Sequence, residues 1–290
     1  MLFRSNWYSD ETVRTAQARL ARECASALAG HPALLAWDLG NENSNCVVPP
    51  DKDSARKWLS AMTGALRSRD RNTAITIGIH MEDLDQDRQL GPQQAAEYCD
   101  FLTMHGYPGY APWAAGPTDE RILPYLTQLT RYLGGGRDVF FTEFGVPTRK
   151  ADESAPLSSP GSGPALVSEE EAASYLGRGL RALAENGAIG AMLWCYADYA
   201  SELFDQPPFD EAPHERSFGL FRADGSAKPA VKQVSSFIAE GHTVASAPAI
   251  ADELFIDVTP DEFYQYSQEH LRRLFRRYCV VAENIEIDAN

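Results

Sequence analysis

Positive charge is in short supply in this sequence, because 26 lysines and arginines are outnumbered by 41 aspartates and glutamates. The resulting formal net charge of -15 repels nucleic-acid phosphates and anionic lipid headgroups. We therefore expect neither a nucleic-acid partner nor a membrane partner, and we favour a neutral or weakly charged ligand. The sequence also lacks a P-loop, a GxGxxG after a strand and a GxSxG, which weakens the case for an enzyme acting on a phosphate ester.

Cysteine is scarce as well, and none of the five cysteines has the CxxC spacing of a zinc site. An odd number without that spacing is typical of reduced thiols, which predicts a cytoplasmic protein. No apolar run is long enough to span a bilayer, and residues 1–11 lack the apolar centre of a signal peptide.

Continuous apolar runs alternate with amphipathic helical stretches along the first 240 residues. Continuous rather than alternating hydrophobicity is typical of parallel strands that are covered on both faces. The spacing of the runs is close to the roughly 30 residues that each unit of a (β/α)₈ barrel occupies. This pattern predicts an α/β fold of the TIM-barrel type. The five predicted strands cover residues 34–42, 72–80, 100–108, 138–146 and 188–199.

The last 50 residues follow a different pattern. Residues 241–258 are rich in alanine and weakly patterned, which predicts a linker. Thr259, Pro260 and Glu262 then have the order of an N-cap, a first-turn proline and an N3 acid, and they open an amphipathic helix. We expect residues 1–240 to form the barrel domain and residues 241–290 to form a linker and a C-terminal helix packed on the barrel.

Polar side chains gather where the predicted strands end. In a parallel α/β barrel these ends face one side, where active sites lie. A strand interior excludes unpaired charge, so an acid belongs at its end. The side chains concerned are Asn41, Glu42, His80, His105, Tyr107 and Glu143. The acidic residues Glu82, Asp83, Asp85 and Asp87, by contrast, are expected to form a solvated loop.

Two carboxylates at strand ends suit the hydrolysis of a glycosidic bond. One carboxyl group protonates the leaving oxygen, and the other stabilises or attacks the oxocarbenium-like centre. A separation of about 5–5.5 Å gives retention of configuration, and about 6.5–9.5 Å gives inversion. Sugars also stack on aromatic faces, and Trp113 and Trp194 are well placed in the sequence to line such a cleft.

Four motifs, "WDLGNE", "MHGYP", "FFTEFG" and "MLWCYAD", resemble the fourth, sixth, seventh and eighth strands of a retaining clan A glycoside hydrolase. The most similar family is glycoside hydrolase family 5, which includes cellulases and β-mannanases, and the resemblance covers about residues 5–238. It implies a retaining β-glycosidase acting on a β-linked glucan, mannan or oligosaccharide, with no metal or organic cofactor.

The resemblance also implies a role for each matching residue. Glu42 is expected to be the general acid/base and Glu143 the nucleophile. The expected substrate-binding residues are Asn41 on the sugar 2-hydroxyl, Tyr107 and His105 beside Glu143, Trp194 under the sugar, and His80 and Trp113 lining the cleft.

Only five of the family's eight strands are found, and the family's arginine from the second strand has no counterpart. We expect about strands 4–8 of an N-terminally incomplete barrel. Three explanations stay open. The chain is a fragment, which could have lost a secretion signal; another chain supplies the missing strands; or the protein is an inactive remnant that binds carbohydrate without turnover.

Overall fold

The computed structural model describes residues 6–149, 163–246 and 256–288. The chain forms two compact units, each assembled from separate stretches. Unit 1 comprises Met1–Met104, Leu129–Phe140 and Asp252–Arg277, and unit 2 comprises His105–Gln128, Phe141–Ala251 and Tyr278–Asn290. These two units do not coincide with the predicted domains, residues 1–240 and 241–290. The predicted domain boundary at residue 240 stays a prediction.

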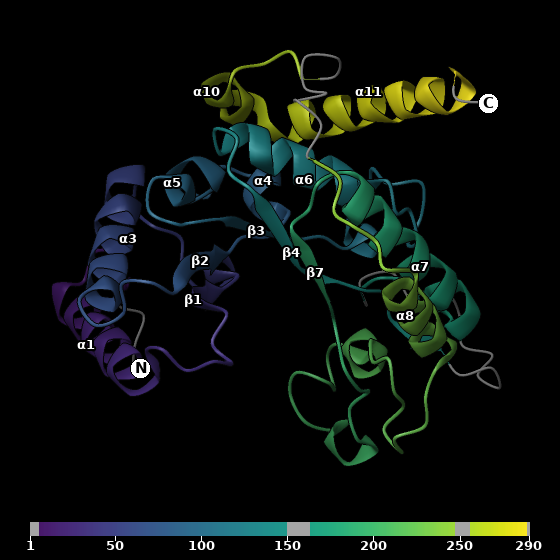
Figure 1. Cartoon of the computed structure of the whole chain (residues 1–290), viewed down its shortest axis with the longest axis horizontal. Helices are drawn as coiled ribbons and strands as arrows, with labels where there is room; N and C mark the ends of the chain where they lie inside the picture. The colour runs from purple at the N-terminus through teal and green to yellow at the C-terminus, as the bar shows by residue number, and fades with distance from the viewer. Residues whose placement is uncertain (1–5, 150–162, 247–255, 289–290) are drawn as a thin grey trace. The chain divides into compact units, whose positions relative to one another are not determined.

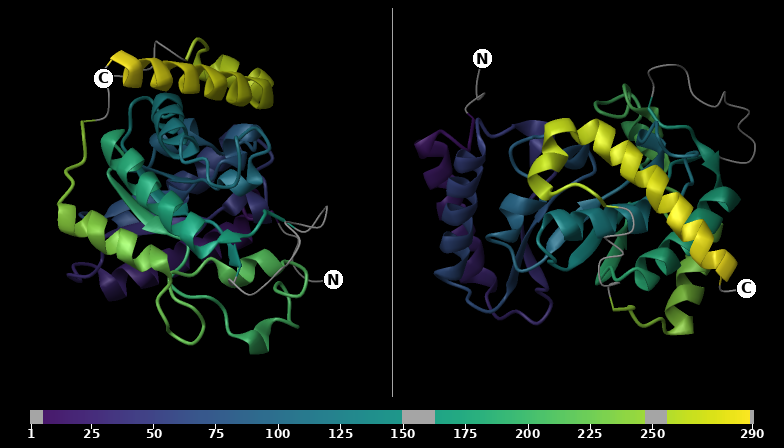
Figure 2. Two further views of the ribbon diagram at one scale, coloured as in Figure 1. Left: turned by 90° about the vertical axis from the view of Figure 1, so that its right-hand side faces the viewer. Right: turned by 90° about the horizontal axis from the view of Figure 1, so that it is seen from above.

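The first part of unit 1 is a strand–helix–strand arrangement. Helices α1 (Glu11–Leu28) and α3 (Lys52–Arg67) lie side by side (Figures 1 and 2). Strands β1 (Ala36–Asn41) and β2 (Ala74–Gly78) pair in parallel. Helix α1 is capped by Asp10, whose carboxylate accepts from the backbone amides of Thr12 and Val13.

Asp70 joins the end of α3 to β1. Its Oδ2 accepts a hydrogen bond from the indole Nε1 of Trp37 at 2.9 Å, and its Oδ1 accepts from the backbone amides of Asn72 and Thr73. The side chain and amide of Thr73, followed by the Trp37 indole, lower the pKa of Asp70 well below its usual range. The buried carboxylate therefore organises the turn that leads into β2.

Three further strands follow in sequence order. Strands β3 (Leu102–His105), β4 (Val139–Phe144) and β7 (Gly190–Leu193) form one sheet in the order β3-β4-β7 (Figure 1). Backbone hydrogen bonds link Leu102 to Asp138 and Gly106 to Glu143, so both strands advance in the same direction. All five predicted strands are therefore present, and the predicted α/β fold with parallel strands is confirmed.

Long helices lie before, between and after strands β4 and β7 in the sequence. Helix α7 (Glu169–Glu185) opens with a capping box of Ser168 and Glu171, and it packs against α8 (Pro229–Glu240). Helix α6 (Ile122–Leu133) precedes β4. The shorter elements are α2 (Asn43–Cys46), α4 (Glu82–Asp85), α5 (Pro92–Ala96), β5 (Thr148–Arg149), β6 (Val167–Ser168) and the 3₁₀ turns Pro108–Tyr110, Ser201–Leu203, Pro213–Ser217 and Tyr264–Tyr266.

The C-terminal segment packs back onto unit 1. Helix α10 (Pro260–Phe263) begins at the predicted Thr259 capping box, and α11 (Ser267–Asp288) follows it. Tyr264 Oη donates to the carbonyl of Asp83 at 3.2 Å, and Ser267 Oγ donates to the carbonyl of Asp85 at 2.8 Å. Within the described ranges, no helix has the length and hydropathy needed to cross a bilayer.

We predict that Asp70→Asn lowers the free energy of unfolding by an amount that depends on pH. The native pKa of Asp70 lies below the unfolded value of about 3.9, so its ionised form stabilises the fold above that pH and less as the pH falls. The substitution should lower the free energy of unfolding by about 1–2 kcal/mol at pH 7. Urea denaturation should show this difference shrinking steadily below about pH 4.

The matched control is Asp53→Asn, because Asp53 is exposed on α3. It should change stability little at any pH. A cost of Asp70→Asn that stays constant down to pH 3 would contradict the assigned role of the carboxylate.

Candidate active site

Glu42 stands directly after β1 in an uncommon backbone conformation. Its φ of 46° and ψ of 48° are left-handed, and its amide still donates to the carbonyl of Gly78 at 3.0 Å. A left-handed non-glycine residue is uncommon and costs energy, and such residues concentrate at functional sites. The parallel pairing of β1 with β2 therefore continues one residue beyond the strand and fixes the base of the Glu42 side chain.

Two glycines make this arrangement possible. Gly40 has a φ of 154°, and a Cβ there would lie 2.2 Å from Asn43 Oδ1. A Cβ on Gly78 would lie 2.9 Å from the Gly40 carbonyl oxygen and 3.3 Å from the Glu42 nitrogen. The strand register shifts here, and Asp38 Oδ1 accepts from the amides of both glycines at 3.0 Å. Close backbone approach, secured by Asp38, thus sets the turn that carries Glu42.

The carboxylate of Glu42 is held from its own side of the turn. Asn45 Nδ2 donates to Glu42 Oε2 at 2.8 Å, and His80 Nδ1 lies 3.9 Å from the same oxygen. The Glu42 side chain is 22% exposed, whereas the His80 side chain is only 6% exposed. His80 is therefore a buried residue beside the Glu42 carboxylate, and its expected role in lining the cleft stays a prediction.

A second layer of polar groups supports Asn45 and His80. Ser44 Oγ lies 2.9 Å from His80 Nε2. Arg88 Nη1 donates to Ser44 Oγ at 3.2 Å and to Asn45 Oδ1 at 3.0 Å, while Arg88 Nη2 pairs with Glu82. Sequence reasoning missed these supports. For Asn45, its position three residues after Glu42 was the available signal, but Arg88 carries no local signal.

The expected solvated acidic loop is corrected in one respect. Asp83 is buried, with 4% of its surface exposed. Its Oδ2 accepts from the His80 amide at 3.2 Å and lies 3.6 Å from His80 Nε2, and its Oδ1 has no hydrogen-bond partner. Burial raises the pKa of Asp83, and His80 and Ser44 oppose that rise. A short helical turn over Glu82–Asp85 folds Asp83 inward, which a run of acids does not predict.

Glu143 lies in unit 2, near the end of β4. Tyr107 Oη donates to Glu143 Oε2 at 2.7 Å, and His105 Nδ1 lies 3.7 Å from the same oxygen. The predicted contact between Tyr107 and Glu143 is thus present, with His105 beside it. A hydrogen bond to the charged form of a carboxylate favours that form. With 17% of its side chain exposed, Glu143 is suited to act as a nucleophile or as an electrostatic stabiliser.

Aromatic rings fix Tyr107 in place. Its ring meets Phe218 edge-on at a centroid distance of 5.9 Å and Tyr110 at 6.0 Å. Tyr110 Oη in turn donates to Glu215 Oε1 at 2.9 Å, and the Tyr110 ring meets His214. The donor to Glu143 is therefore held by packing and is not left to rotate.

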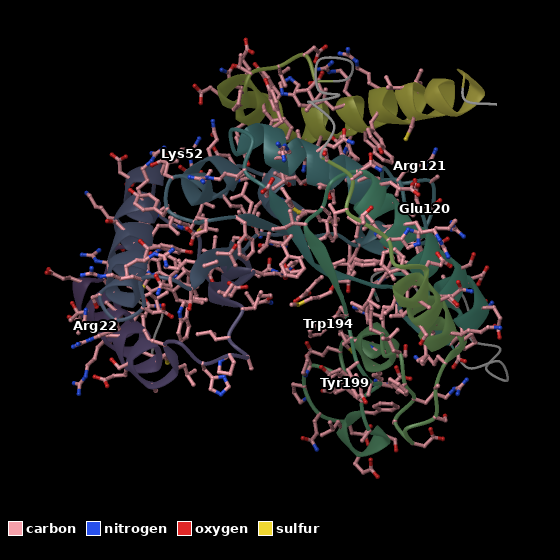
Figure 3. The ribbon with its side chains drawn as sticks, in the orientation of Figure 1. Arg22, Lys52, Glu120, Arg121, Trp194 and Tyr199 are labelled. Atoms are coloured by element: carbon pink, nitrogen blue, oxygen red, sulfur yellow. The ribbon has the colours of Figure 1, made fainter. Side chains whose placement is uncertain are left out.

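Trp194 follows β7 beside β4. Its amide donates to the carbonyl of Phe144 at 2.9 Å, and a Cβ on Gly145 would lie 2.2 Å from the Trp194 carbonyl oxygen. Gly145 therefore allows the two backbones to approach. Trp194 is half-buried, and Figure 3 shows it on the segment that leaves β7 toward Tyr199. Its peptide bond to Cys195 is cis.

The other two candidates have different settings. Asn41 is exposed at the end of β1. Trp113 packs edge-on against Tyr125 of α6, with ring centroids 6.0 Å apart. The sugar-binding roles of both residues stay predictions, as do the catalytic roles of Glu42 and Glu143. Taken by itself, neither unit brings three described His, Cys, Asp or Glu ligand atoms close enough to hold a metal ion.

Comparison with known proteins places this geometry in context. No protein-family model matches the chain. Mannan endo-1,4-beta-mannosidase 5 of Arabidopsis thaliana is 24% identical over 143 residues, which are 42% of this chain and 32% of that protein. Mannan endo-1,4-beta-mannosidase 7 of the same plant is 24% identical over 138 residues. The chain thus spans about a third of the length of the curated relatives it matches.

Solved structures agree on the fold. A GH5_18 protein from Streptomyces cattleya, in complex with Manb1-4GlcNAc, matches with a TM-score of 0.76 at 21% identity, over 97% of this chain and 68% of that one. An exo-beta-1,4-mannosidase from Opitutaceae bacterium strain TAV5 matches with a TM-score of 0.62 at 25% identity, over 83% and 42%. The resemblance to glycoside hydrolase family 5 is confirmed. The parallel strands described above thus match strands of the glycoside hydrolase family 5 fold.

We predict that Gly78→Ala destabilises the protein, because the added Cβ must displace the Gly40–Glu42 backbone. Overpacking of this kind costs about 1–3 kcal/mol, which urea denaturation can measure. The control is Gly64→Ala on the exposed face of α3, where nothing lies within 4 Å of the added atom. That change should stabilise the helix by about 0.5–1 kcal/mol. Equal effects of both substitutions would contradict the close approach at Gly78.

Proposed function

We propose that this protein is a retaining β-glycoside hydrolase that cleaves β-mannosidic bonds, with other β-linked glucans or oligosaccharides as secondary substrates. The mannosidases among its relatives and the Manb1-4GlcNAc bound by a structural neighbour support this choice of sugar. In this proposal the five strands correspond to the fourth to eighth strands of a (β/α)₈ barrel, whose active site lies at the carboxyl ends of the strands.

The observation that carries the proposal is the hydrogen bond from Tyr107 to Glu143, with His105 beside it. A nucleophilic carboxylate must stay ionised until it attacks the anomeric carbon. The phenolic donor favours that ionised form and fixes the orientation of the carboxylate. The ionised Glu143 then forms the covalent glycosyl-enzyme.

Glu42 has the complementary task. In the first step it gives a proton to the leaving glycosidic oxygen, and in the second it takes a proton from the water that hydrolyses the glycosyl-enzyme. Charge repulsion from Glu143 keeps Glu42 protonated at first, and that repulsion ends when Glu143 becomes an ester. Asn41 is proposed to bind the sugar 2-hydroxyl and Trp194 to stack beneath the ring. Trp113 keeps a subsidiary role in sugar contact.

The test is hydrolysis of 4-nitrophenyl β-mannoside, mannan and Manb1-4GlcNAc by the 290-residue chain. Glu143→Gln should abolish turnover of all three. Glu42→Gln should lower kcat about 10²–10⁴-fold on the two natural substrates, because they need a protonated leaving group. On the nitrophenyl glycoside it should spare the release of the first nitrophenolate and slow the later water step.

The matched control is Glu97→Gln, since Glu97 pairs with Arg56 away from the site. It should leave turnover unchanged. Full activity of either active-site variant would remove the role assigned to it. Binding of Manb1-4GlcNAc by the wild-type chain without any turnover would instead favour the non-catalytic carbohydrate-binding protein.

We further predict retention of configuration. Double displacement at one carbon gives a product with the anomeric configuration of the substrate, whereas direct attack by water inverts it. Proton NMR of the first product formed from an aryl β-mannoside should show the β-anomer before mutarotation. An initial α-anomer would exclude the covalent mechanism.

A further inference from the structure

A network of polar side chains leads from Arg88 to the carboxylate of Glu42. The inference drawn from this network rests on the proposed role of Glu42 as acid/base. Arg88 Nη1 donates to two acceptors, Asn45 Oδ1 at 3.0 Å and Ser44 Oγ at 3.2 Å. Each acceptor begins an arm that leads to Glu42. Arg88 is mostly buried, with 16% of its side chain exposed, so its charge is only partly screened by water.

The first arm is direct. With its oxygen occupied by Arg88, Asn45 presents its amide nitrogen to Glu42 Oε2 at 2.8 Å. An amide has one acceptor oxygen and one donor nitrogen, so the Arg88 contact decides which end faces Glu42. The guanidinium thus ensures that Glu42 meets a donor.

The second arm runs through His80. Ser44 Oγ accepts from Arg88 and lies 2.9 Å from His80 Nε2, and Asp83 Oδ2 lies 3.6 Å from the same ring nitrogen. The other ring nitrogen, Nδ1, lies 3.9 Å from Glu42 Oε2. Both arms therefore end at the same oxygen of Glu42, and the Asn45 arm ends there in a hydrogen bond.

Other charges also act on Glu42. Within unit 1 they are the acids Glu82, paired with Arg88, and Asp83, beside His80. Glu82 and Asp83 offset part of the positive field, so the effect of Arg88 is transmitted mainly by the oriented amide of Asn45.

We propose that Asn45 and Arg88 are positioning residues that hold the Glu42 carboxylate through Oε2 and favour its ionised form. This arrangement opposes the repulsion from Glu143. It allows Glu42 to lose its proton readily once the glycosyl-enzyme forms, so that it can act as base. The residues act through Glu42 and do not touch the substrate.

The first test measures the pKa of Glu42 directly and needs no turnover. The carboxyl ¹³C resonances of a glutamate-labelled chain are followed from pH 3 to 9, and the Glu42 signal is the one missing in Glu42→Gln. Asn45→Ala and Arg88→Gln should each raise the pKa of Glu42 by about one unit, since each removes a donor or its orienting charge. Asn45→Asp should raise it further, and Arg88→Lys less.

The controls are Asn72→Ala, an exposed asparagine in a turn, and Arg56→Gln, an arginine paired with Glu97. Neither should move the Glu42 signal. Thermal unfolding identifies any variant that does not fold. If Asn45→Ala or Arg88→Gln does not fold, the pKa of Glu42 is measured in Asn45→Asp and Arg88→Lys instead. An unchanged pKa of Glu42 in the folded Asn45 and Arg88 variants would overturn the proposal.

The second test is the pH dependence of kcat/KM on the β-mannoside. Its alkaline limb reports the loss of the proton from Glu42, so it should move up by about one pH unit in Asn45→Ala and Arg88→Gln. A purely structural role would lower the rate without moving the limb, and that result would contradict the proposal. If the wild-type chain hydrolyses no glycoside, the proposed function fails, while the NMR titration still decides the role of Asn45 and Arg88.

Discussion

Two backbone hydrogen bonds, one in each of two parallel sheets, govern which side chains emerge at the ends of the strands. Glu42 donates its amide to Gly78, and Gly106 donates its amide to the carbonyl of Glu143. Each bond extends a strand pairing one step beyond the strand itself. Because successive side chains of a strand point to opposite faces, a slip of one residue would send each carboxylate into the wrong environment. At the first junction Gly78 allows the backbones to approach closely, whereas at the second a Cβ on Gly106 would meet the side chains of Leu126 and Phe141.

The two carboxylates are supported in different ways, and this difference matches the two tasks assigned to them. Glu143 receives a phenolic hydrogen bond from Tyr107, whose ring is locked between Tyr110 and Phe218. Glu42 receives an amide hydrogen bond from Asn45, which depends on a distant arginine. A rigid donor suits a group that stays ionised until it reacts. A donor that is oriented by a neighbouring positive charge suits a group that must release its proton in the second step.

Sequence reasoning succeeded where the signal was local. The five strands, the helix cap at Thr259 and the strand-end positions of Glu42 and Glu143 all follow from short-range pattern, and the structure contains them. The contact of Tyr107 with Glu143 was reached only through family resemblance, because 36 residues separate the two.

What could not be predicted depends on tertiary contacts. Arg88 meets Asn45 across 43 residues, and nothing in its neighbours marks it. Asp83 is buried because the C-terminal segment covers its turn, with Tyr264 bonded to its carbonyl across 181 residues.

The central claim is that Glu143 attacks the sugar and Glu42 completes the reaction. A 2-deoxy-2-fluoro-mannosyl fluoride tests it most directly, because its leaving group departs readily while the fluorine slows hydrolysis of the covalent intermediate. The account predicts that mass spectrometry of the proteolysed protein finds one fluorosugar, esterified to Glu143, and that Glu42→Gln retains the label longer than the wild type. Attachment to any other residue, or turnover with no attachment, would contradict it.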